Sequence, residues 1–233
     1  FAPASPGFIA DPYPVLAELR AAGRVHFHEA THLWLVTRHA DVNAILRDRR
    51  FGRTYLHLAS HADMGREREP AWQDPFWQVV RNGMLDREAP DHTRLRSLVS
   101  KAFTPRMVEG LRGRIQQIVD TLIDRALAKG TFDLLADFAE PLPVAVIAEL
   151  LGVPEADRAA LRPWSADMCL MYELNAAEES ARRAVRASEE FAAYLRAMVR
   201  ERRARPGDDL ISTLAQVAEA GDRLSEDEVI GTC

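Results

Sequence analysis

Apolar residues recur at intervals of three and four along most of the chain, which is the spacing of helices that bury one face. One long run begins at Thr104 and Pro105, a pair typical of a helix start, and it ends at Gly130. Further helices are predicted over 11–22, 41–48, from 91 onward, over 134–151, from 155 with a break near Pro163, from 175 to about 205, and over 208–220.

Strand-like composition is confined to the front of the chain. The stretch "VHFHEATHLWLVT", residues 25–37, is rich in β-branched and aromatic residues around a polar turn at 29–31, which predicts a hairpin. From Arg49 to Glu88 neither period holds, because glycines and prolines interrupt it, so we expect a long functional or mobile loop. The predicted fold class is mainly α with a small β-hairpin region.

The last residues, "LSEDEVIGTC", carry a helix-start signal. Ser225 followed by Glu228 is a capping box, and Val229 and Ile230 continue the pattern. The chain stops inside the helix that these signals predict. We therefore expect residues 1–233 to be the amino-terminal part of one longer domain.

Composition disfavours several classes of partner. Acidic residues outnumber Lys and Arg by 35 to 30, which argues against a nucleic acid or an anionic membrane. No apolar run reaches the roughly 18 residues of a membrane span, and no signal peptide is recognisable, so we expect a cytoplasmic protein. The only cysteines, Cys169 and Cys233, are too few for a disulfide framework or a metal knuckle. His57 and His61 lack the glutamate of a zinc-protease helix, so no metal site is predicted.

The candidate chemistry lies in "DHTRLRSLVSKAFTPR", where His92 and Arg96 are four residues apart and so share a helix face. The planar guanidinium suits a carboxylate, His adds a second donor, and the first helical turn adds unpaired N–H groups. The matching ligand is an anion, preferably a pair of carboxylates. In the alternative, both side chains sit in water or bond to Asp91 or Glu88, and spacing alone favours that alternative.

A longer resemblance favours the anion-binding interpretation of His92 and Arg96. The segment "APDHTRLRSLVSKAFTP" resembles the helix C signature of the bacterial cytochrome P450 family, the haem-thiolate monooxygenases. The segments "DPYPVLAELRAAGRVHFHE", "LWLVTRHADVNAILRDRRFGR" and "LPVAVIAELLGVPEAD" resemble other parts of the family in the expected order. The resemblance implies the cytochrome P450 fold, helices A to H with the first β-strands, cut at the start of the long central I helix.

The resemblance also implies roles for individual residues. His92 and Arg96 would bind the two propionates of haem b, and Met84, Leu85 and Phe103 would line the porphyrin edge. The family has Asp-Pro-Pro ahead of the histidine where this chain has Glu88, Ala89 and Pro90, so the helix cap is expected to differ.

The stretch from 53 to 83 corresponds in the family to the loop that roofs the substrate pocket, and 163–174 to another part of that roof. The resemblance implies Trp77, Val80 and Met168 as substrate-binding residues, with packing against the body as the alternative for the aromatic ones. We interpret Cys169 as a small buried hydrophobe.

The chemistry of the family needs a cysteine thiolate on the haem iron. Neither Cys169 nor Cys233 has the surroundings of that ligand, so we expect it beyond residue 233 and expect this chain alone to be inactive, with no catalytic residue of its own.

Three functional hypotheses follow. In the first, the chain belongs to a monooxygenase that hydroxylates or otherwise oxidises a small apolar molecule with O₂ and electrons from a ferredoxin-type redox partner, as a monomer. In the second, it is a haem-free cytochrome P450-like auxiliary protein that binds a partner enzyme. In the third, it is an unrelated helical ligand-binding or regulatory domain. The presence of His92 and Arg96 favours haem.

Overall fold

The computed structural model describes residues 1–173, 176–219 and 221–233. The chain divides into two compact units, 1–52 and 53–233.

The first unit holds the predicted hairpin. Strands β1 (Val25–His28) and β2 (Leu33–Val36) pair antiparallel, with Val25 opposite Val36, and a 3₁₀ turn over Glu29–Thr31 joins them. The hairpin prediction is therefore confirmed. Helices α1 (Pro6–Ala10) and α2 (Tyr13–Ala22) precede it and α3 (His39–Arg47) follows it.

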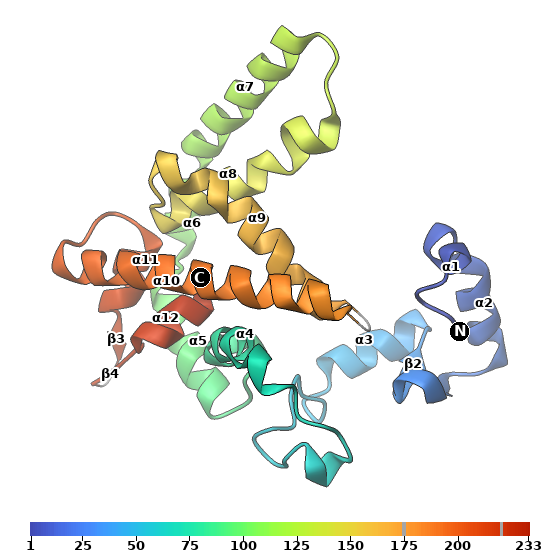
Figure 1. The fold of residues 1–233 in the computed structure, drawn as a ribbon. Helices are drawn as coiled ribbons and strands as arrows, with labels where there is room; N and C mark the ends of the chain where they lie inside the picture. Colours follow the sequence, from blue (N-terminus) through green and yellow to red (C-terminus); the bar gives the residue numbers. More distant parts are fainter. Residues whose placement is uncertain (174–175, 220) are drawn as a thin grey trace. The chain divides into compact units, whose positions relative to one another are not determined.

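The second unit is built around the long helix α10 (Glu178–Ala204). In Figure 1, α10 crosses the unit with α9 (Arg158–Cys169) on one side and α4 (Asp74–Asn82) and α12 (Glu226–Thr232) on the other. One core cluster joins α10 to α5 (Asp91–Ala102), α8 (Pro141–Leu151), α9, α11 (Leu210–Gln216) and α12. The start predicted for α10, Asn175, lies outside the described residues.

The prediction of an irregular stretch from 49 to 88 is wrong where helix α4 forms. Pro75 stands in its first turn, where a missing N–H costs nothing, and Gly83 follows its end. Phe76, Val79 and Val80 have helical spacing, and Phe76 is fully buried. The pattern was too short, between a proline and a glycine, to stand out against loop composition. Short 3₁₀ turns over Ala62–Met64, Ala71–Gln73 and Met84–Asp86 occupy part of the remaining stretch.

Several helix boundaries also differ from those predicted. The run from Thr104 to Gly130 is two helices, α6 (Pro105–Gly110) and α7 (Arg112–Lys129), because Gly110 and Gly113 weaken the helix around their junction. The predicted break at Pro163 is wrong, since α9 continues through it. Pro163 and Ala159, whose carbonyl loses its partner, are both exposed, so water can replace the missing bond.

The other boundaries change the fold less. A π-helical turn (Leu135–Ala139) precedes α8, and 3₁₀ turns flank α9 at Glu155–Asp157 and Leu170–Tyr172. Helix α11 ends at Gln216, and the short strands β3 (Ala218–Glu219) and β4 (Asp222–Arg223) follow it; the predicted end, Ala220, lies outside the described residues. The capping box of Ser225 and Glu228 at the start of α12 is confirmed.

Candidate functional site

His92 lies in the first turn of α5, half-buried, with its orientation fixed by the backbone. Its ring Nδ1 lies 2.9 Å from the carbonyl oxygen of Met84, in the turn just before the helix. Because a carbonyl only accepts, Nδ1 carries the proton and donates, which leaves Nε2 as the outward ring nitrogen. The imidazole is therefore held in one orientation and has one nitrogen available to a ligand.

Arg96, one turn further along the same face, is exposed and makes no ion pair with any residue in the described ranges. The acids nearest in sequence are engaged elsewhere. Asp91 pairs with Arg87 at 3.0 Å, and the Glu88 carboxylate accepts from the backbone N–H groups of Arg53 and Thr54. Those two bonds lower the pKa of Glu88. Neither Asp91 nor Glu88 pairs with Arg96, so that part of the alternative does not describe this structure. The other part, a side chain in water, does describe the exposed Arg96.

The start of α5 also bears on anion binding. Its N-cap residue, Pro90, makes no side-chain hydrogen bond to the helix, and Glu88 is turned toward the 53–54 backbone. In the first turn, the His92 N–H donates to the Glu88 carbonyl oxygen at 2.9 Å, so the backbone caps part of the helix start.

The predicted porphyrin contacts lie at both ends of α5. Met84 packs its side chain against the core cluster, while Leu85 is 66% exposed and Phe103, the C-cap residue, is 45% exposed. Exposed side chains of this size are available to cover an apolar ligand.

An apolar cavity of about 330 Å³ lies among α4, α8, α9 and α12. It brings together three of the predicted residues, Val80, Met168 and Leu85. Residues that the sequence did not single out complete its wall: Val79, Gly83, Asp86, Val144, Ile147, Leu151, Leu161, Ser165, Cys169, Tyr172, Phe191, Ile230, Gly231 and Cys233. These residues come from elements far apart in sequence, so no local pattern predicted that they meet.

Trp77 does not line this cavity. It packs with Val80 and Met168 against the buried Phe76, and its indole N–H donates to the Gln73 side chain at 3.1 Å. Cys169 lies at the cavity with an exposed surface, so the interpretation of a buried residue is wrong; α9 turns this position outward.

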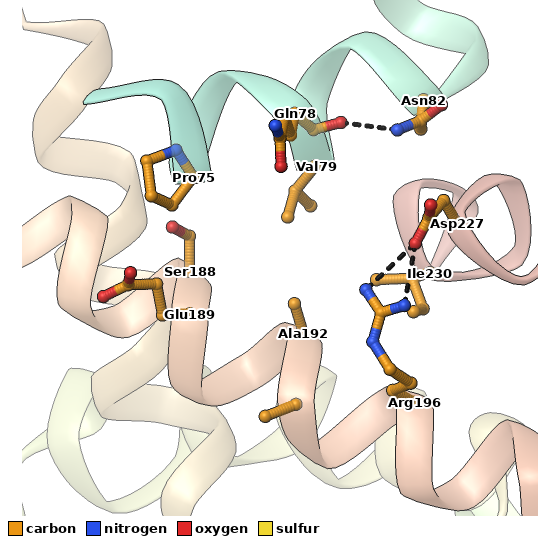
Figure 2. Close-up of a pocket in the computed structure, with 11 residues that line it drawn as sticks. Pro75, Gln78, Val79, Asn82, Ser188, Glu189, Ala192, Arg196, Asp227 and Ile230 are labelled. Atoms are coloured by element: carbon orange, nitrogen blue, oxygen red, sulfur yellow. Dashed lines mark hydrogen bonds and ion pairs between the residues drawn. The ribbon is translucent and has the colours of Figure 1, made fainter. Parts of the chain in front are cut away.

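A second cavity, of about 570 Å³, lies on the other side of the contact between α4 and α12 (Figure 2). Figure 2 shows Val79 of α4 above Ala192 of α10, with Arg196 paired to Asp227 of α12 at 2.9 Å. Val79 and Ile230 line both cavities and so form part of the wall between them.

Within the described residues, no group of three or more His, Cys, Asp or Glu side chains is arranged to hold a metal ion. No helix in the same ranges is long and apolar enough to cross a membrane.

Comparison with known proteins identifies the family. The chain is 39% identical over 230 residues to the cytochrome P450 monooxygenase PikC of Streptomyces venezuelae, an alignment that covers 96% of this chain and 51% of that protein. It is 41% identical over 204 residues to cytochrome P450 CYP107DY1 of Priestia megaterium, covering 85% and 48%. The solved structure of P450BioI, in complex with hexadec-9Z-enoic acid ligated acyl carrier protein, superposes with a TM-score of 0.84 at 33% identity, covering 99% and 57%. The chain belongs to the bacterial cytochrome P450 family.

This cytochrome P450 chain spans about half the length of the relatives it matches. No family model matches it. Membership of the family implies haem as the cofactor, and the start of α5 fits that group on its own geometry. An oriented imidazole shares one face there with a guanidinium that has no ion pair among the described residues, and two propionates would supply carboxylate partners.

Proposed function

We propose that this chain is the amino-terminal part of a cytoplasmic, monomeric haem-dependent monooxygenase that oxidises a small apolar molecule. Haem b is the proposed cofactor, O₂ the oxidant, and a ferredoxin-type protein the source of electrons. Haem with a cysteine thiolate, the ligand expected beyond residue 233, supplies the oxygen-activating chemistry when bound.

The observation that carries the proposal is the charge arrangement at the start of α5. Arg94 and Arg96 are two residues apart, yet Arg94 is neutralised by Asp222 and Glu228 while Arg96 has no ion-pair partner in the described part of the chain. An anionic ligand would supply the partner that the exposed Arg96 lacks in the described part of the chain, next to the oriented His92. Under this proposal, His92 and Arg96 hold the propionates, and Leu85 and Phe103 cover the porphyrin edge. Because a carboxylate only accepts, His92 would carry a second proton on Nε2 when it binds a propionate.

The apolar cavity supports the choice of substrate class. Val80 and Met168 contribute apolar surface to it, and burial of such surface is the main source of affinity for an apolar ligand. P450BioI, the relative whose structure holds an acyl chain on a carrier protein, shows that a similar scaffold accepts an aliphatic group. We propose a substrate with an apolar portion of this kind. Trp77 would act from behind the cavity wall, through its packing on Phe76 at a ring-centroid distance of 5.0 Å.

The proposed role of His92 and Arg96 is tested by replacing both residues in the full-length protein. The double variant His92→Ala, Arg96→Ala is expected to lose haem to an acceptor apoprotein at least about tenfold faster than wild type, because each charge-assisted bond contributes about 1.5–3 kcal/mol. Arg125→Ala is the matched control, since Arg125 is exposed on α7 and without an ion pair among the described residues. Equal rates of haem loss in wild type and the double variant would overturn the assignment of the pair.

A further inference from the structure

The backbones of α12 and of the residue after α4 touch without an intervening side chain. Gly231 lies in α12, and Gly83 follows α4. A Cβ atom added at Gly231 would lie 2.7 Å from the Val79 carbonyl oxygen and 2.7 Å from the Asn82 carbonyl carbon. A Cβ added at Gly83 would meet the Gly231 carbonyl. Every one of these obstacles is backbone, so no side chain can rotate away and relieve the clash.

Both glycines also line the apolar cavity. Around them the wall continues with Val79 and Val80 from α4 and Ile230 from α12, and Met168 of α9 lines the same cavity. The distance between α4 and α12 therefore fixes the width of the cavity on this side.

The cavity wall offers few charged groups that could bind a charged ligand. Asp86 is the one carboxylate among the lining residues that the structure describes, and Arg53 pairs with it at 2.9 Å. The remaining polar side chains of the lining, such as Ser165, are neutral. An uncharged group is the chemical complement of such a wall.

We propose that Gly83 and Gly231 determine ligand specificity in the proposed monooxygenase site, by holding α4 and α12 at backbone contact so that the cavity accepts a slim, uncharged apolar group such as a phenyl ring or an unbranched alkyl chain. This inference rests on the proposed function. A methyl group at either position forces the helices apart and separates the two sides of the wall.

The experiment compares two probes that bind haem iron through the same nitrogen, imidazole and 4-phenylimidazole, in the full-length protein. Imidazole reports only that the iron is reachable, while the phenyl ring must also enter the cavity. Gly231→Ala is expected to lower the affinity for 4-phenylimidazole by about tenfold, a change typical of a misfitted apolar group, and to leave the affinity for imidazole within about twofold.

Gly113→Ala is the matched control, because Gly113 is also helical and an added Cβ there meets nothing within 4 Å. It should leave both affinities unchanged. An unchanged ratio of the two affinities in Gly231→Ala would overturn the inference. If imidazole gave no spectral change in wild type, the proposed haem function would fail instead, so the two failures are distinguishable.

Loss of folding in Gly231→Ala, with Gly113→Ala intact, would itself support the backbone contact. Hydrogen exchange of the wild-type protein then decides the binding claim. Amides of residues 79–83 and 229–233 should exchange more slowly with 4-phenylimidazole than with imidazole. Equal exchange with the two probes would show that the phenyl group binds elsewhere and would overturn the inference.

Discussion

At the scale of single residues, neighbouring arginines of α5 have opposite environments. Arg94 pairs with Glu228 of α12 and, at 3.2 Å, with Asp222 of β4. Arg96 makes no ion pair in the described ranges. The sequence predicted that His92 and Arg96 share a helix face, because they are four residues apart in a long periodic helix. The sequence did not predict the ion pairs of Arg94, since their acidic partners come more than a hundred positions later.

Replacement of Arg94 by Ala should destabilise the full-length protein. Glu228 is mostly buried and would lose its ion-pair partner, so we expect the free energy of unfolding to fall by about 2 kcal/mol, less than for a fully buried pair because Arg94 is itself partly exposed. Arg112→Ala breaks an exposed pair with Glu109 three residues away and should cost less than about 0.5 kcal/mol. Urea denaturation of both variants measures this, and equal losses would contradict the structural role of Arg94.

The pKa of Glu88 gives a prediction with a definite sign. Backbone N–H groups of Arg53 and Thr54 lower this pKa, so the native state binds the proton less readily than the unfolded chain, whose value is about 4.3. The stabilisation is present above the unfolded pKa and is lost as the pH falls through the folded one. Glu88→Ala should therefore be less stable than wild type at neutral pH, and the difference should shrink in acid. A difference that grows toward low pH would show that Glu88 does not hold the 53–54 backbone.

At the scale of elements, prediction succeeded where a period runs for several turns and failed where it is short. The hairpin, α5, α10 and the capped start of α12 follow from pattern and caps. Helix α4 escaped prediction because its apolar positions become meaningful only when α10 and α12 cover them. The apolar cavity was also not predicted, since four helices from distant parts of the sequence form it.

Phe76 tests whether α4 is anchored as the structure places it. Its side chain is 0% exposed and contacts Ala184 and Val185 of α10 in one cluster. Phe76→Ala should lower the free energy of unfolding by about 3–5 kcal/mol, as expected for a large cavity in a core. Leu127→Ala, at a position 71% exposed on α7, should change it by less than about 0.5 kcal/mol. A loss for Phe76→Ala no larger than that of the control would mean that α4 is not packed on α10.

At the scale of the whole molecule, the chain is about half of a cytochrome P450 by length. The described residues carry a face suited to haem propionates and much of an apolar cavity, but their cysteines lack the surroundings of a haem ligand. The family follows from the sequence, while the way in which α4, α9 and α12 combine required the structure.

The most direct measurement is the absorption spectrum of the full-length protein, reduced and bound to carbon monoxide. The proposal predicts bound haem with the Soret band of a thiolate-ligated iron. Purified, folded protein that takes up no haem, or whose haem shows the band of a nitrogen-ligated iron, would contradict it and would favour a haem-free auxiliary role.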